Sequence, residues 1–233
     1  MNGLLTTFQQ ALQLLLAGDQ ELWTIVFLSF SVSLKAIIIT TPLALLLAFA
    51  LTHGKFAGIR IILTFINSLQ AVPTVVIGLF LYVLLSRQGP FGDLRLLFTQ
   101  TAMVVGQMLL CFPILVALGY AAIKTVDRRV WETARTLGAP VWFSMLTVLY
   151  EVRFGLVAAV LTSFGRVISE VGISMMVGGN IMGYTRNITT AIALETSKGE
   201  FAQGIALGLV LLTLAFLLSV LLSYLQGSKE FSR

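Results

Sequence analysis

The chain has 233 residues, of which 58% are hydrophobic and only 11% are charged, and its mean hydropathy is +0.96. Because no soluble domain needs that much apolar surface, the composition excludes a soluble protein and predicts a polytopic membrane protein. The net charge of +5 does not indicate a nucleic-acid partner, since the basic residues mostly flank hydrophobic stretches. The one cysteine, Cys111, lies inside such a stretch, which excludes a disulfide within the chain and argues against a thiolate metal cluster.

The first helix expected along the chain covers residues 3–16. Its apolar stripe is made of Leu4, Phe8, Leu12 and Leu15. The segment is too short and too polar to cross a membrane, which takes about 20 largely apolar residues. A one-sided apolar stripe is typical of a helix that lies at the membrane surface. We therefore expect residues 1–21 to form an interfacial helix and an external lead-in.

Five later stretches are long and apolar enough to span a membrane. They are residues 22–51, 59–86, 99–123, 154–177 and 203–225. The second carries Asn67 and Gln70 near its middle, which favours a helix that faces protein or water rather than lipid. The pattern predicts an all-α membrane domain over residues 22–225 with five transmembrane helices, followed by a short tail over residues 226–233.

A charged segment, residues 124–153, separates the third and fourth of these stretches, yet helix signals continue through it. Asp127 is placed to cap the start of a short helix. Gly138 can adopt the left-handed conformation that ends one helix, and Pro140 can begin the next without needing its N–H. The segment therefore predicts two short helices with a bend at residues 138–139.

The distribution of basic residues predicts the orientation in the membrane. One side holds nine of them: Lys55, Arg60, Lys124, Arg128, Arg129, Arg135, Arg153, Lys229 and Arg233. The other side holds four: Arg87, Arg95, Arg186 and Lys198. Basic residues are enriched on the cytoplasmic side, so we expect the charged segment and the C-terminus inside the cell and the N-terminus outside.

Three ionisable side chains fall within the expected spans, where charge is costly. Arg166 and Glu170 are four residues apart, so they can meet on one helix face. Either they form a self-neutralising pair that orients the helix at a subunit interface, or Arg166 faces the pathway and attracts an anion. The long side chain of Lys35 can reach the membrane surface, and no role is assigned to it.

The segment beyond Glu170, residues 172–204, is only weakly hydrophobic and contains a helix break at Gly178 and Gly179. A solvated external loop is the simplest interpretation. Residues 188–194 are apolar enough for a re-entrant or interfacial turn under a docking partner. Glycine-rich backbone is also a place where an oxyanion can bind. The sequence leaves these alternatives open.

The charged segment resembles the "EAA…G" cytoplasmic loop of ABC-transporter permeases, with Glu132, Thr133, Ala134 and Gly138 at the motif positions. Thr133 replaces the middle alanine of that motif, and residues 148–151 replace its later Ile-x-Leu-Pro. The resemblance implies that these four residues belong to a coupling helix that docks into a groove of the ATPase subunit.

Over residues 20–225 the chain resembles the permeases of type I importers for molybdate, sulfate and tungstate. The resemblance is carried by residues 67–79, around Pro-x-Val-x-x-Gly, and by residues 164–180 after the charged loop. Three segments are similar to the tungstate-specific permeases in particular: residues 150–153, 183–186 and 194–199.

That family implies a multi-pass protein of a bacterial or archaeal cytoplasmic membrane, in contact with lipid. It acts as a homodimer with two ABC ATPase subunits and an external solute-binding protein. The chain itself would be no enzyme and would bind no cofactor or metal, with ATP and Mg on the partner ATPase. Arg166, Glu170, Asn67 and Gln70 are the candidates for the translocation path or a subunit interface.

Two alternatives remain at this point. A molybdate or sulfate permease belongs to the same class. An ion-coupled secondary transporter would need titratable groups along a path, and Lys35, Arg166 and Glu170 are the candidates. A membrane enzyme fits poorly, because one histidine (His53, expected at the surface), one cysteine and one carboxylate within the spans make no acid–base or metal constellation.

Overall fold

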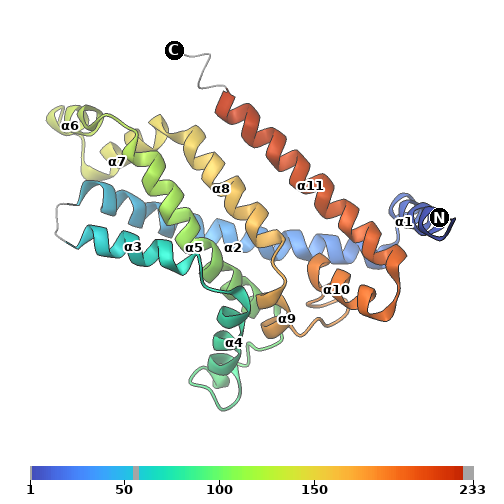
Figure 1. Ribbon diagram of the computed structural model, residues 1–233. Helices are drawn as coiled ribbons and strands as arrows, with labels where there is room; N and C mark the ends of the chain where they lie inside the picture. Colours follow the sequence, from blue (N-terminus) through green and yellow to red (C-terminus); the bar gives the residue numbers. More distant parts are fainter. Residues whose placement is uncertain (1, 55–57, 228–233) are drawn as a thin grey trace.

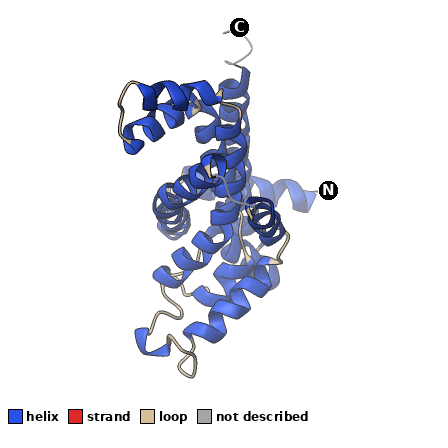
Figure 2. Ribbon diagram, turned by 90° about the vertical axis from the view of Figure 1, so that its left-hand side faces the viewer, coloured by secondary structure: helices blue, strands red, loops and turns tan. Residues whose placement is uncertain are grey.

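The computed structural model describes residues 2–54 and 58–227, and within these ranges every regular element is a helix (Figure 2). The all-α fold class is therefore confirmed. The end of the expected tail (residues 228–233), together with Lys55, Lys229 and Arg233 of the charge comparison, lies outside the described residues.

The chain forms these helices in order: α1 (Asn2–Leu16), α2 (Gln20–His53), α3 (Ile59–Leu69), α4 (Thr74–Leu85), the 3-10 turn η1 (Gly92–Leu94), α5 (Gln100–Lys124), α6 (Arg128–Thr136), α7 (Val141–Glu151), α8 (Arg153–Ile168), α9 (Gly172–Gly178), α10 (Ile188–Lys198) and α11 (Phe201–Gly227).

By length and composition, α2, α5 and α11 can each cross a membrane as single helices. The pairs α3–α4 and α7–α8 meet the same criteria together, but they are bent by 94° and 75°. The described residues thus provide three spans, or up to five if each bent pair is one span. The multi-pass architecture agrees with the sequence, whereas the second and fourth expected spans are not single helices.

The break in the second span lies between Leu69 and Thr74 and follows from Pro73. A proline has no N–H to donate, and it disfavours helical backbone in the residue before it. Pro73 accordingly adopts φ −59° and ψ 129°, and α4 begins at the next residue. In the fourth span α8 ends at Ile168 and α9 begins at Gly172, so residues 154–177 also contain a break.

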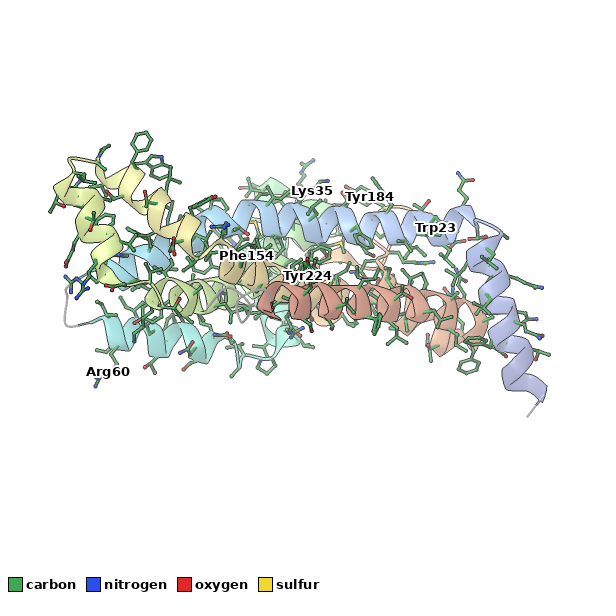
Figure 3. All side chains as sticks on the ribbon, turned by 90° about the horizontal axis from the view of Figure 1, so that it is seen from above. Trp23, Lys35, Arg60, Phe154, Tyr184 and Tyr224 are labelled. Atoms are coloured by element: carbon green, nitrogen blue, oxygen red, sulfur yellow. The ribbon has the colours of Figure 1, made fainter. Side chains whose placement is uncertain are left out.

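The main core lies where α2 packs against α5. Small residues allow close approach, as is common between membrane helices. Ala36, Ala44 and Ala48 of α2 are fully buried, and a Cβ on Gly119 of α5 would lie 3.3 Å from that of Ala48. Lys35, on the same helix, is exposed and projects away from the bundle (Figure 3).

A second core joins α1, α2, α10 and α11 at the far end of the molecule (Figure 1). Ala11 of α1 is fully buried there beside Leu22 of α2 and Leu207 of α11. Phe8 and Leu12, which belong to the apolar stripe read from the sequence, remain exposed. The predicted amphipathic helix is therefore present, with part of its apolar surface uncovered.

Of the alternatives left open for residues 172–204, a solvated loop describes only the exposed connection over residues 179–184, because the rest of the segment includes α9 and the buried start of α10. Ile188, Thr190 and Ala191 of α10 are fully buried, and Glu195 is nearly so. The two glycines do end α9 as predicted, with Gly179 at φ 70°.

Candidate coupling site and a pair of helix breaks

Helices α6 and α7 form the bent pair that the sequence predicts. The Asp127 carboxylate accepts a hydrogen bond from the Arg129 N–H at 2.9 Å and so caps α6. Gly138 adopts φ 86°, and Pro140 directly precedes α7. A Cβ on Gly138 would meet nothing within 4 Å, so the backbone conformation, rather than space, requires glycine there.

The four motif residues lie on or next to α6. Glu132, Thr133 and Gly138 are exposed, and Ala134 is half-buried. The Glu132 carboxylate lies 3.1 Å from the Arg128 guanidinium on the same helix. The Arg135 guanidinium, which no sequence motif singles out, donates to the Ala139 carbonyl at 2.8 Å. This contact holds the bend between the two helices.

The α6–α7 pair exposes a large apolar surface at the opposite end of the molecule from α1 (Figure 1). Leu137 is 82% exposed and Trp142 is 57% exposed. Val141, Phe143 and Tyr150 are exposed beside them. The charged residues Arg128, Glu132 and Arg135 are exposed on the same pair of helices. Apolar surface of this kind marks a binding site for a protein or a membrane.

The break between α3 and α4 lies against the break between α8 and α9. A Cβ on Gly172, the first residue of α9, would lie 2.9 Å from Cγ2 of Val75 and 3.1 Å from Oγ1 of Thr74. A Cβ on Gly78 of α4 would lie 3.1 Å from Cα of Ile173. Glycine at these positions lets α4 and α9 touch along their backbones.

The predicted Arg166–Glu170 pair forms at 2.9 Å beside this contact. The Glu170 side chain is 3% exposed, whereas that of Arg166 is 46% exposed. The second carboxylate oxygen of Glu170 accepts a hydrogen bond from the Gly172 N–H at 2.8 Å. The backbone carbonyl of Glu170 accepts a hydrogen bond from the Thr189 hydroxyl at 2.7 Å. Glu170 therefore stabilises the break in the chain as well as pairing with Arg166.

Asn67 and Gln70 lie at the other break, where both are exposed. The Gln70 amide donates to the Asn67 side-chain oxygen at 3.2 Å. The four candidate residues for the path or interface thus form two local pairs, one at each of the adjacent breaks.

A buried polar network that was not predicted from the sequence lies at the start of α10. The Asn187 amide donates to the Ser174 hydroxyl at 2.9 Å, and its oxygen accepts from the Thr190 N–H at 2.9 Å. The Thr190 hydroxyl in turn accepts a hydrogen bond from the Asn187 N–H at 3.1 Å, which completes a capping box. The Asn-x-x-Thr spacing is a variant of the usual signal and could have identified this helix start.

The charged residues of the far end also form a cluster. Arg186 lies 3.5 Å from Glu21, at the start of α2, and 4.0 Å from Glu195 of α10. Lys198 lies 3.0 Å from Glu195. Among residues 2–54 and 58–227, no group of three or more His, Cys, Asp or Glu side chains is arranged to hold a metal ion.

Comparison with known proteins identifies close relatives. The chain is 40% identical to the tungstate uptake system permease protein TupB of Peptoclostridium acidaminophilum, over 94% of this chain and 96% of the relative. It is 40% identical to TupB of Campylobacter jejuni, over 91% and 89%. The molybdenum transport system permease protein ModB of Escherichia coli is 28% identical, over 76% and 82%.

Two solved structures share the fold. A crystal structure of an amino acid ABC transporter has a TM-score of 0.60 at 16% identity, covering 90% of this chain and 96% of that chain. The inward-facing MetNI methionine ABC transporter has a TM-score of 0.56 at 16% identity, covering 91% and 92%. Residues 40–228 match the family described as binding-protein-dependent transport system inner membrane component. The chain belongs to that family, and it is a multi-pass membrane subunit of an ABC transport complex.

Proposed function

We propose that this chain is the permease subunit of an ATP-driven tungstate importer. The two TupB relatives support this substrate, because their 40% identity extends over nearly the whole chain. The molybdenum permease is more distant, at 28% identity over a smaller part of the chain. Tungstate is therefore the proposed substrate, and molybdate or sulfate is the alternative substrate within the same class of permeases.

The observation that carries the proposal is the protruding α6–α7 pair. It is stiffened by the Asp127 cap and the Arg135–Ala139 contact, and its apolar surface is exposed. A rigid protrusion with an uncovered apolar face can be gripped and moved by a partner, whereas a flexible loop cannot. We assign Glu132, Thr133, Ala134 and Gly138 to the contact with the ATPase subunit.

The proposed complex contains two copies of this chain, two ABC ATPase subunits and an external solute-binding protein, within lipid. The family description, with its dependence on a binding protein, supports the external partner. ATP and Mg would bind to the ATPase subunits, and this chain would hold no cofactor. Closure of the ATPases would draw the α6–α7 pairs together and switch the spans between inward-open and outward-open states.

The orientation follows from the positions of the basic residues. Lys124, Arg128, Arg129 and Arg135 gather at the end of the molecule that carries α6 and α7 (Figure 1). Arg186 and Lys198 lie at the other end, in and beside α10. We therefore place the α6–α7 pair and the C-terminus in the cytoplasm and the N-terminus outside.

The two adjacent helix breaks are the proposed lining of the interface between the two copies, where the path would also run. The partly exposed Arg166 supports this assignment, because its remaining N–H donors are free to reach a second copy or an anion while Glu170 stays buried. Asn67 and Gln70 present exposed polar groups at the neighbouring break. Discontinuous membrane helices commonly provide polar backbone at a transport path.

The test uses the whole complex in proteoliposomes with its binding protein. Glu132→Arg and Gly138→Asp should each abolish tungstate uptake and its coupling to ATP hydrolysis, while the variants still insert in the membrane. Normal uptake by both variants would remove the coupling assignment. Competition among tungstate, molybdate and sulfate would decide the substrate, and uptake without ATP would point to a secondary transporter instead.

A further inference from the structure

Helix α6 is attached to the bundle by few side chains. It has no buried residue, and only Val130 and Trp131 pack against the main core. Trp131 is the one aromatic residue of this helix and directly precedes Glu132 in the coupling motif. A movement of α6 can therefore reach the membrane helices by two routes. One is through α7, and the other is through Val130 and Trp131.

The Trp131 ring is held by two rings at the end of α2. Its centroid lies 5.3 Å from that of Phe49, in an edge-on arrangement, and 4.9 Å from that of His53. Phe49 and His53 stack on each other at 4.2 Å, and the His53 Nδ1 atom lies 3.3 Å from the Phe49 carbonyl oxygen. His53, which was expected at the surface, is half-buried, and its ring packs within this cluster.

The cluster is connected to the far end of the molecule by a single helix. Phe49 is 8% exposed and belongs to the main core, and α2 continues without interruption from His53 back to Gln20. Near its other end, Ser29 accepts the Ile188 N–H of α10 at 2.7 Å, and Glu21 lies 3.5 Å from Arg186. Although Pro42 lies within it, α2 is one helix, so it provides a continuous helical connection between the aromatic cluster and the polar contacts of α10.

Space for movement lies beside the tryptophan. A cavity of about 220 Å³ is lined by Trp131 and His53 together with Thr52, Lys124 and Val148. Interiors are otherwise close-packed, so a cavity at this position lets the ring change its angle without separating α2 from α5. The Trp131 ring thus packs against Phe49 and His53 and also borders a cavity, and a side chain that moves while it stays in contact with its partners requires both.

We propose that Phe49, His53 and Trp131 form an aromatic joint that passes the movement of α6 to α2, with Trp131 and His53 as positioning residues for transport. The proposal rests on the proposed function, since it presumes an ATPase on the α6–α7 surface. Its role differs from that of Trp142: Trp142 is exposed on the α6–α7 surface to which the ATPase is proposed to bind, whereas Trp131 packs against the main core.

The experiment compares three tryptophan variants in the reconstituted complex. Trp131→Ala should retain the ATPase subunit and its ATP hydrolysis while tungstate transported per ATP falls by about threefold to thirtyfold, the range typical of residues that couple two sites. Trp142→Ala should instead lose the ATPase subunit. Trp23→Ala, an exposed residue at the other end of α2 (Figure 3), is the matched control and should leave transport per ATP unchanged.

Rescue separates a joint from a merely structural contact. His53→Ala should reduce transport per ATP as Trp131→Ala does, and the double variant should be no worse than the poorer single variant. Trp131→Phe and His53→Phe, which keep a ring, should restore at least half of the coupling. The proposal is overturned if Trp131→Ala transports normally, if it loses ATPase subunits in proportion to transport, or if the ring-retaining variants do not recover. Absence of ATPase from the wild-type complex would instead overturn the proposed function.

Discussion

The Ser29 hydroxyl oxygen accepts a hydrogen bond from the Ile188 N–H at 2.7 Å, although 159 residues separate the two positions. Both residues are buried, and the same hydroxyl donates to the Ile25 carbonyl at 2.8 Å. One side chain therefore satisfies the first N–H of α10 and fixes this helix to α2. This contact explains why a weakly hydrophobic segment is packed rather than solvated.

Replacement of Ser29 by alanine should destabilise the protein by about 1–3 kcal/mol, because the buried Ile188 N–H loses its acceptor. Thermal unfolding of purified protein in detergent measures the effect. Ser219→Ala is the matched control, since the Ser219 hydroxyl is exposed and donates only to the Ala215 carbonyl of its own helix. Equal melting temperatures for the two variants would show that the Ser29 contact does not stabilise α10.

Local signals made the α6–α7 pair predictable from sequence. Asp127, Gly138 and Pro140 act within a few residues of their own positions, so capping and turn preferences determine the two helices and the bend. The spacing of Arg166 and Glu170 likewise predicts their ion pair without knowledge of the fold. Features that depend on neighbours in sequence were therefore accessible.

Features that depend on distant segments were not accessible. Pro73 indicates a break, but hydropathy does not give the angle between the helices on either side of it. Residues 59–86 were therefore predicted as one span, whereas they form two helices at 94°. The Phe49–Trp131 contact joins positions in different helices, and nothing near Trp131 indicates its partner. The packing of α4 on α9 through Gly78 and Gly172 equally needs the tertiary fold.

Gly106 of α5 should not tolerate a larger residue. A Cβ there would lie 2.2 Å from Cγ2 of Ile173 in α9, so Gly106→Ala should destabilise the protein by about 1–3 kcal/mol through overpacking. Removal of the obstructing methyl group should compensate: Gly106→Ala with Ile173→Ala should be less destabilised than the sum of the single variants. Thermal unfolding measures all three.

Gly208→Ala provides the control for the Gly106 variant. Gly208 lies within α11, and its Cβ would meet nothing within 4 Å. Alanine should stabilise that helix by about 0.5–1 kcal/mol, because glycine loses more backbone entropy on folding. Strict additivity of the Gly106 and Ile173 substitutions would contradict the close contact between α5 and α9.

Substitutions of Glu170 can separate its ion pair with Arg166 from its hydrogen bond with the Gly172 N–H. Glu170→Gln keeps an oxygen that can accept the Gly172 N–H, whereas Glu170→Ala leaves that partly buried N–H without its acceptor. We expect the alanine variant to be less stable than the glutamine variant by about 1–3 kcal/mol. Glu132→Ala, which breaks the exposed pair with Arg128, should change stability by less than about 1 kcal/mol. If glutamine and alanine at position 170 unfold at the same temperature, the carboxylate does not stabilise the break.

For uncharged replacements, the backbone conformation of Gly138 should decide how well the substitution is tolerated. At φ 86° an alanine costs about 1–2 kcal/mol even though its Cβ has open space, and this shifts the equilibrium away from the bent pair by about 5- to 30-fold. Asparagine tolerates this conformation better, and valine tolerates it less. Uptake per ATP should therefore fall in the order Gly138, Gly138→Asn, Gly138→Ala, Gly138→Val.

Gly18→Ala is the matched control, since Gly18 has φ 70° in open space beside α1, and it should leave coupling unchanged. Wild-type coupling in Gly138→Val would show that the bend is not needed to engage the ATPase.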